Sequence, residues 1–252
     1  MKEQHYFYTP QMNGELPEEE ARHALRVLRL SVGDSLCLMD GRGNFYEAVI
    51  TSSTGHRCLY RLTATHPQTP LWKGNIHLAM APTKLMDRTE WFVEKATEIG
   101  LDGVSFLDCD NSERRQIKTD RIERIVVAAM KQSRKAFKPE VTDMTPFDRF
   151  VTQPRTGQCF ICHCHDDIPQ DPADARCHLM EAMQKGMPAT VLIGPEGDFS
   201  VREVELALAG GYRSVHLGHS RLRTETAALV AVHCMQLLNQ CPDGLTQTSL
   251  QI

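Results

Sequence analysis

The sequence predicts an α/β protein in two parts, a small β-barrel followed by a larger domain built on a mostly parallel sheet. Turn signals such as Asn13-Gly14 and Asp40-Gly41 are dense in the first 70 residues and separate short segments with β character. Beyond residue 75, β-prone and helical segments alternate, which is typical of a parallel sheet covered by helices on both faces. The stretch HPQTPLWKG (66–74) contains two prolines and a glycine, so we place the domains at 1–70 and 71–252.

Four strands and one helix are expected in the first domain. The strands are HYFYT, SLCLMD, NFYEAVITS and RCLYRLTAT. The helix runs from Pro17 to Leu30 and carries Arg22, Arg26 and Arg29 at the spacing i, i+4 and i+7, which forms one stripe. This stripe is interpreted either as a solvated helix face or as a row of phosphate contacts on a nucleic-acid-binding module.

The second domain is expected to alternate strands with helices in a regular order. The predicted strands are NIHLAMA, GVSFLDC, QCFICHC, ATVLIG and SVHLG. The predicted helices cover about 87–99, closed by Gly100, then a segment from Thr119, a segment near 174–185, a segment after Ser200 and a segment from Thr224. In such folds ligands bind at the carboxyl ends of the strands.

The composition is that of a globular protein, with 41% hydrophobic residues in 252 and no apolar run near the roughly 20 residues of a membrane helix. Nine cysteines in a chain of this length are expected to be reduced, which favours a cytoplasmic location. The net charge is −4, yet residues 112–138 hold nine Lys and Arg against three Asp and Glu. This basic segment predicts a docking surface for an anionic partner.

The stretch ATVLIGPEGDFS is the first candidate site. ATVLI lacks polar alternation, as expected for a central parallel strand, and Gly194 and Gly197 allow a ligand to approach the main chain closely. Ser200 and Glu203 have the spacing of a capping box that starts the next helix. By itself the stretch is equally compatible with an ordinary β-to-α turn.

A second strand, loop and helix repeat this design in SVHLGHSRLRTETAALV. Two such loops at one sheet edge predict a pocket. Thr224 is expected to be the N-cap of the last helix, with Arg221 and Arg223 next to Glu196 and Glu225. These charges either act on a ligand or only pair with each other to hold the loops. Neither loop has a G-x-G-x-x-G or G-x-x-x-x-G-K-[ST] pattern, which argues against a dinucleotide or NTP site.

The stretch CFICHCHDD (159–167) has metal-ligand residue types without the spacing of a structural zinc site. In an alternating strand Cys162 and Cys164 point one way while His163 and His165 point the other, and no second pair of ligands follows. No metal is therefore expected.

Taken together, these motifs resemble the 16S rRNA (uracil-N3)-methyltransferase family of the SPOUT class. IGPEGDFS is similar to the first cofactor loop of that family and LGHSRLRTETA to the second, while EKATEIG, SERR and QSRKAFKPEV lie between them in the family's order. ARHALRVLRLSVGD and DGRGNFYEAVI are similar to its PUA-like RNA-binding barrel. Two positions differ from the family pattern, because Asp198 stands where a second glycine is usual and Ser220 where an arginine is usual.

The resemblance implies a trefoil knot, a homodimer, S-adenosyl-L-methionine as the cofactor and 16S rRNA or the small ribosomal subunit as the partner. It implies cofactor contacts, largely through backbone, for Ile193, Gly194, Pro195, Glu196, Gly197, Leu217, Gly218, Ser220, Leu222, Arg223 and Thr224. The catalytic candidates are Arg223, Arg221, Glu196 and Glu225. An arginine would stabilise charge on the uracil carbonyls as N3 loses its proton, and a glutamate would orient that arginine or accept the proton.

The RNA-binding candidates combine the arginine stripe with the basic segment. They are Arg22, Arg26, Arg29, Arg114, Arg124, Lys131, Gln132, Arg134 and Lys135. Within the helix expected from Thr119, Arg124, Lys131 and Lys135 fall opposite the apolar positions Ile122, Ile125, Val126 and Ala129. Two other functions stay open. One is a SPOUT enzyme that methylates another RNA atom such as a ribose 2′-hydroxyl, and the other is a non-catalytic RNA-binding factor for ribosome assembly.

Overall fold

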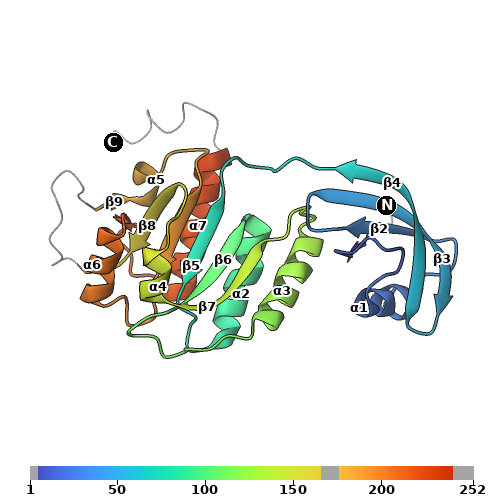
Figure 1. The fold of residues 1–252 in the computed structure, drawn as a ribbon, viewed down its shortest axis with the longest axis horizontal. Coiled ribbons are helices and arrows are strands. Elements are labelled where there is room, and N and C mark those ends of the chain that lie inside the picture. The colour runs from blue at the N-terminus through green and yellow to red at the C-terminus, as the bar shows by residue number, and fades with distance from the viewer. Residues whose placement is uncertain (1–4, 166–175, 241–252) are drawn as a thin grey trace. The chain divides into compact units, whose positions relative to one another are not determined.

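A computed structural model describes residues 5–165 and 176–240. The chain divides into two compact units (Figure 1). The N-terminal unit comprises residues 1–71 together with 126–138, and the C-terminal unit comprises 72–125 together with 139–252. No helix of the described residues is long and apolar enough to cross a membrane.

The N-terminal unit contains one four-stranded sheet whose strands follow the order of the sequence. The strands are β1 (Tyr6–Tyr8), β2 (Ser35–Met39), β3 (Asn44–Thr54) and β4 (Arg57–Pro67). β1 pairs parallel with β2, and the remaining pairs are antiparallel. Alternate side chains including Phe7, Leu36, Leu38 and Ile50 are buried in one core. All four strands expected from the sequence are present.

The helix expected over 17–30 differs from the prediction. It consists of α1 (Glu18–Arg22) and a π-helical turn, η1 (His23–Val27), in which the Leu28 N–H donates to the His23 carbonyl at 3.0 Å. A π turn holds more residues than an α turn, so the i, i+4, i+7 spacing no longer defines one face. Arg29 lies past the helix with a φ of 56°. The prediction that the three arginines form one stripe on a helix is therefore wrong.

Residues 126–138 group with the N-terminal unit through hydrogen bonds to the turn before β3. The helix α3 (Thr119–Gln132) has its second half in this unit. After it, the Ala136 carbonyl accepts from the Gly43 N–H at 2.9 Å, and the Lys138 N–H donates to the Gly41 carbonyl at 2.8 Å. A segment distant in sequence is thus held by β-type pairing, which local patterns do not reveal.

The C-terminal unit is built on a seven-stranded sheet in which every adjacent pair is parallel. Its order is β7-β6-β5-β10-β8-β11-β9. The strands are β5 (Ile76–Met80), β6 (Gly103–Asp108), β7 (Glu140–Pro146), β8 (Gln158–Cys162), β9 (Cys177–His178), β10 (Ala189–Ile193) and β11 (Arg213–His216). The parallel sheet predicted from the alternation is confirmed.

Helices cover the sheet on both faces (Figure 1). The helices α2 (Met86–Ile99) and α7 (Thr224–Gln240) pack together, and α7 lies against β5 and β10. The helices α4 (Phe147–Thr152) and α6 (Val201–Ala209) pack together over a second cluster that includes Leu192 and Phe199. With both faces covered, all five residues of β10 are buried, as its apolar run predicted.

Some elements were missed or misplaced by the sequence patterns. β7 and α4 were not predicted. The sequence of β7, EVTDMTP, is polar and forms an edge strand whose side chains are exposed or partly buried. The helix expected near 174–185 is, over the described residues, the short strand β9 followed by α5 (Leu179–Ala182). Thr224 is the first residue of α7 rather than its N-cap. The trefoil knot stays a prediction.

The strand order explains where a site can form. β10 lies between β5 and β8, and β8 lies next to β11. The loops that follow β10, β8 and β11 therefore leave the sheet side by side at its carboxyl edge.

Candidate functional site

A cavity of about 590 Å³ opens at this carboxyl edge, between the loops after β8, β10 and β11 and the start of α7. Every residue predicted for cofactor binding or catalysis lines it. They are Ile193, Gly194, Pro195, Glu196, Gly197, Leu217, Gly218, Ser220, Arg221, Leu222, Arg223, Thr224 and Glu225. Arg88, Cys162, His163, Cys164 and Asp198 also line the cavity and were not on the predicted list.

The loop after β10 is a tight turn closed by Asp198. The Asp198 N–H donates to the Pro195 carbonyl at 2.9 Å, and Asp198 itself has a φ of 63°. Its Oδ2 accepts from the Cys164 N–H at 2.7 Å and its Oδ1 from the Phe199 N–H at 2.8 Å. A left-handed backbone conformation favours glycine, which is the residue that the family resemblance leads us to expect at this position. Here the aspartate side chain instead fastens this loop to the end of β8.

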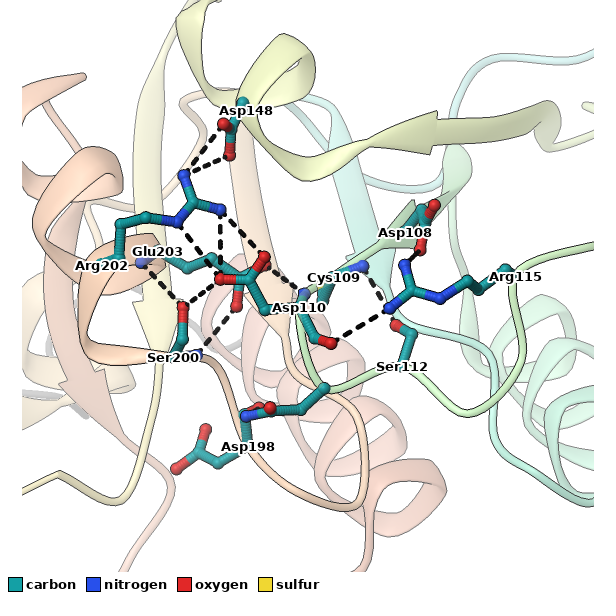
Figure 2. A network of polar contacts seen from close by, with 11 residues as sticks. Asp108, Cys109, Asp110, Ser112, Arg115, Asp148, Asp198, Ser200, Arg202 and Glu203 are labelled. Atoms are coloured by element: carbon teal, nitrogen blue, oxygen red, sulfur yellow. Dashed lines mark hydrogen bonds and ion pairs between the residues drawn. The ribbon is translucent and has the colours of Figure 1, made fainter.

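A buried carboxylate holds the far end of the same loop (Figure 2). Glu203 is fully buried; its Oε1 accepts from the Asp110 N–H at 2.9 Å and its Oε2 from the Ser200 N–H at 2.8 Å. The Ser200 Oγ accepts in turn from the Glu203 N–H at 3.2 Å, so the predicted capping box is confirmed. Arg202 pairs with both Asp110 and Asp148 on the outer side of this network.

Asn111, in the loop after β6, supports the turn directly. Its Nδ2 donates to the Gly197 carbonyl at 3.2 Å and to the Asp198 carbonyl at 3.0 Å. A Cβ on Gly197 would lie 3.2 Å from the Cβ of Asn111, so the absence of a side chain permits this contact. Glu196 is fastened as well, because its Oε1 accepts from the Lys84 N–H at 2.9 Å.

The loop after β11 is held by histidine. The Nδ1 of His216 accepts from the Gly218 N–H at 3.1 Å, and Gly218 has a φ of 111° with open space where a Cβ would lie. The His216 ring lies 5.5 Å from that of His178 and 6.0 Å from that of His219, measured between centroids. Burial and then the nearby charge of His178 lower the pKa of His216. The neutral ring keeps Nδ1 available as an acceptor.

The ion pair of the cavity involves an arginine that the sequence motifs did not single out. Arg88, from α2, lies with its Nη1 3.5 Å from the Oε1 of Glu225. Among the described residues, Glu225 forms its ion pair with Arg88. No ion pair of the described residues joins Arg221 or Arg223 to Glu196 or Glu225. Arg88 was missed because it is far from both cavity loops in the sequence and carries no motif of its own.

The end of β8 is organised by hydrogen bonds. The Nε2 of His163 lies 2.8 Å from the Ser214 Oγ, and the Nε2 of His165 donates to the Phe199 carbonyl at 2.6 Å. Burial raises the pKa of the Cys162 thiol, and burial followed by the charge of Asp198 raises that of Cys164. In the part of the chain that the structure describes, no cluster of His, Cys, Asp or Glu is arranged to hold a metal ion.

Six of the nine predicted RNA-binding residues are exposed. They are Arg22, Arg26, Arg29, Arg124, Gln132 and Arg134. Arg114 is half-buried and donates to the carbonyls of Thr83 and Lys84.

Lys131 and Lys135 differ from the prediction. The Lys131 Nζ donates to both carboxylate oxygens of Glu20, at 2.7 and 2.8 Å, and the two side chains are only 21% and 11% exposed. Lys131 thus closes a half-buried ion pair within the N-terminal unit and does not present a solvated charge. Lys135 lies beyond the end of α3, not on its polar face, and burial lowers its pKa.

Comparison with known proteins shows which protein family the chain belongs to. The family model described as an RNA methyltransferase domain matches residues 70–236, and the RNA methyltransferase PUA domain matches residues 16–62. Ribosomal RNA small subunit methyltransferase E from Synechocystis is 28% identical, over 86% of this chain and 70% of that protein.

Two solved structures are similar over nearly their whole length. A probable rRNA-methyltransferase from Porphyromonas gingivalis is 41% identical with a TM-score of 0.86, over 94% of this chain and 99% of that one. Ribosomal RNA small subunit methyltransferase E from Neisseria gonorrhoeae, solved with S-adenosyl methionine bound, is 26% identical with a TM-score of 0.78, over 94% and 98%. The chain therefore belongs to the RNA methyltransferase family, and within it to the group that resembles the 16S rRNA (uracil-N3)-methyltransferases, with a PUA domain ahead of the methyltransferase domain.

Proposed function

We propose that this protein transfers a methyl group from S-adenosyl-L-methionine to N3 of a uridine in the 16S rRNA of the small ribosomal subunit. The observation that carries the proposal is the cavity between two glycine-containing loops, which gathers every predicted cofactor-binding and catalytic residue at the carboxyl edge of one sheet. The names of the relatives supply the small-subunit ribosomal RNA, and the family resemblance of the sequence motifs supplies the position on the base.

The residues of the cavity suit this cofactor. A volume of about 590 Å³ lies in the range of small-molecule pockets. Gly218 leaves open space at its Cβ position, so a flat ring could lie against the main chain. Apolar contacts are available from Ile193, Leu217 and Leu222.

S-adenosylmethionine supplies an activated methyl group, so the chain must align the nucleophile and manage one proton. N3 of uracil becomes a nucleophile when its hydrogen leaves, and negative charge then spreads to the two carbonyl oxygens. Arg223, or Arg221, would stabilise that charge as a preorganised donor. Glu196 or Glu225 would orient the arginine or accept the proton. N3 is blocked by base pairing, so the target would be unpaired or drawn from its stack.

RNA contacts are proposed for the exposed basic residues. In the N-terminal unit these are Arg22, Arg26, Arg29 and Arg134, with Gln132 two residues before Arg134. In the C-terminal unit Arg124 is exposed and Arg114 is half-buried. Lys131 is left out because Glu20 holds its ammonium group. Such contacts neutralise phosphates, so binding would weaken steeply with salt.

A homodimer with cofactor pockets near the subunit interface, and action in the cytoplasm, complete the proposal. Both follow from the family resemblance and from the ribosomal substrate. Light scattering in solution would return twice the chain mass of 28.4 kDa for a dimer.

The test is methylation in vitro. Purified protein, S-adenosylmethionine and small ribosomal subunits from cells that lack the gene would be incubated, and the digested rRNA analysed by mass spectrometry. We expect 3-methyluridine. A methylated ribose instead would favour the other SPOUT activity, and the absence of both S-adenosylmethionine binding and product would favour a non-catalytic assembly factor.

A further inference from the structure

Glu225 has one carboxylate oxygen whose hydrogen-bonding capacity is unused. Its side chain is 10% exposed and lines the cavity, its Oε1 lies 3.5 Å from Arg88 Nη1, and its Oε2 has no hydrogen-bond partner among the described residues. Leaving a buried oxygen of a carboxylate without a donor is costly. Such an atom at the wall of a cavity indicates that the occupant supplies the donor.

The other carboxylates of the cavity are already used. Asp198 accepts from two backbone N–H groups, one on each oxygen. Glu196 is exposed and accepts from the Lys84 N–H. Among the described residues, Glu225 is therefore the buried carboxylate of the cavity wall that has one oxygen paired, Oε1 with Arg88, and one oxygen, Oε2, without a partner.

We propose that Glu225 Oε2 accepts the N3 proton of the target uridine, and that Arg88 is a positioning residue for this base. The inference rests on the proposed function and assigns the proton acceptor that it leaves open. The N3–H bond breaks and its proton passes to Oε2. The electron pair left on N3 forms the bond to the methyl carbon, and the carbon–sulfur bond breaks with its pair going to sulfur. The products are 3-methyluridine, neutral S-adenosylhomocysteine and a protonated Glu225, which returns its proton to water.

Arg88 determines which oxygen is available. By holding Oε1 from α2, it leaves Oε2 to the ligand. Oε2 is itself buried, and the last torsion of a glutamate side chain is soft, so the carboxylate would present this oxygen to a ligand by rotation. Arg88 itself is 35% exposed and lines the cavity, which places both partners at one wall.

The first test is Glu225→Gln, which keeps the shape of the side chain and an oxygen for Arg88. With small ribosomal subunits as substrate, kcat should fall by about 100-fold or more, the scale of lost general-base catalysis. Calorimetric affinity for S-adenosylhomocysteine should stay close to that of the unmodified protein. The matched control is Glu205→Gln, an equal change of charge at an exposed position of α6, which should leave turnover unchanged.

A second substrate separates proton transfer from structure. Small subunits from gene-deficient cells grown with 5-fluorouracil carry a uracil whose N3–H is more acidic, so a base should matter less. The fall in kcat caused by Glu225→Gln should therefore be smaller on this substrate than on unmodified small subunits. Arg88→Met should lower kcat with little change in KM for RNA, and Arg88→Lys should restore part of it, because an ammonium group can still hold Oε1.

Three results would overturn the assignment. They are normal turnover by Glu225→Gln, loss of S-adenosylhomocysteine binding as its main defect, and an equal deficit on both uracils. Each is distinct from failure of the proposed function, in which the unmodified protein itself would make no 3-methyluridine and both proposals would fall.

Discussion

The carboxylate of Asp198 accepts the backbone N–H of Cys164 at 2.7 Å, which ties the loop after β10 to the end of β8. Asp198 occupies a left-handed backbone conformation, at a φ of 63°, at a position where the family resemblance leads us to expect glycine. The two requirements conflict, because the conformation favours glycine and the hydrogen bonds require the side chain. Substitutions at this residue separate them.

Asp198→Ala should destabilise the protein by about 2–3 kcal/mol, since it removes an acceptor from the Cys164 and Phe199 N–H groups and keeps a Cβ in a strained conformation. Asp198→Gly should cost less, because it relieves the backbone. Urea unfolding of both variants measures the difference. Equal losses of unfolding free energy in the two variants would show that backbone strain at residue 198 contributes nothing. Unchanged stability in both variants would show that the Asp198 side chain does not stabilise the loop.

Arg223→Ala should lower turnover by about 100-fold or more while the fold and S-adenosylhomocysteine affinity are kept, if Arg223 stabilises charge on the uracil carbonyls. Single-turnover methylation and calorimetry are the measurements. Arg221→Ala serves as the comparison at the neighbouring arginine of the same wall. A larger loss in Arg221→Ala would transfer the role to Arg221, and normal turnover in both would contradict arginine catalysis.

Arg26→Ala and Lys131→Met should affect different properties. Removing the exposed Arg26 should weaken RNA binding. The slope of log binding constant against log salt concentration should fall in magnitude by roughly 0.7–0.9, the value for one phosphate contact. Lys131→Met should leave that slope unchanged and instead lower stability by about 2 kcal/mol, because it strands the half-buried Glu20 carboxylate. Filter binding across a salt series and urea unfolding distinguish them. A slope change in Lys131→Met would restore Lys131 to the RNA-binding set.

His77 predicts a pH dependence of stability. Burial, and then the charge of Arg155, lowers the pKa of His77 from 6.5 to about 4, and its Nε2 lies 2.8 Å from Ser105 Oγ. Because the unfolded chain binds this proton more readily than the folded protein, neutral His77 contributes to the free energy of unfolding. This contribution is complete above pH 6.5 and is lost as the pH falls to about 4. It amounts to at most about 3 kcal/mol. His77→Gln should flatten the stability curve in that window. Parallel curves for both proteins would refute the assignment.

The sequence anticipated the cavity because its determinants are local. ATVLI is apolar without alternation, Ser200 and Glu203 have capping-box spacing, and Gly194 and Gly218 lie within two residues of the ends of strands. Parallel strands end at one edge, so two such loops had to lie close together once the strands were known. The capping box and the burial of β10 are confirmed on this basis.

Features that depend on tertiary contacts were not accessible in this way. Arg88 meets Glu225 because α2 packs on α7, and Lys131 meets Glu20 because the end of α3 joins the N-terminal unit. No pattern within α1 signals the π turn that displaces Arg29. The two ion pairs depend on an arrangement that residue spacing along a single helix does not encode.

The most direct test of the central claim is nucleoside mass spectrometry of small-subunit rRNA from cells with and without the gene. The account predicts that 3-methyluridine is present with the gene, absent without it, and restored when the unmodified chain is supplied. An unchanged level of 3-methyluridine in cells that lack the gene, with loss of a different methylated nucleoside, would contradict it.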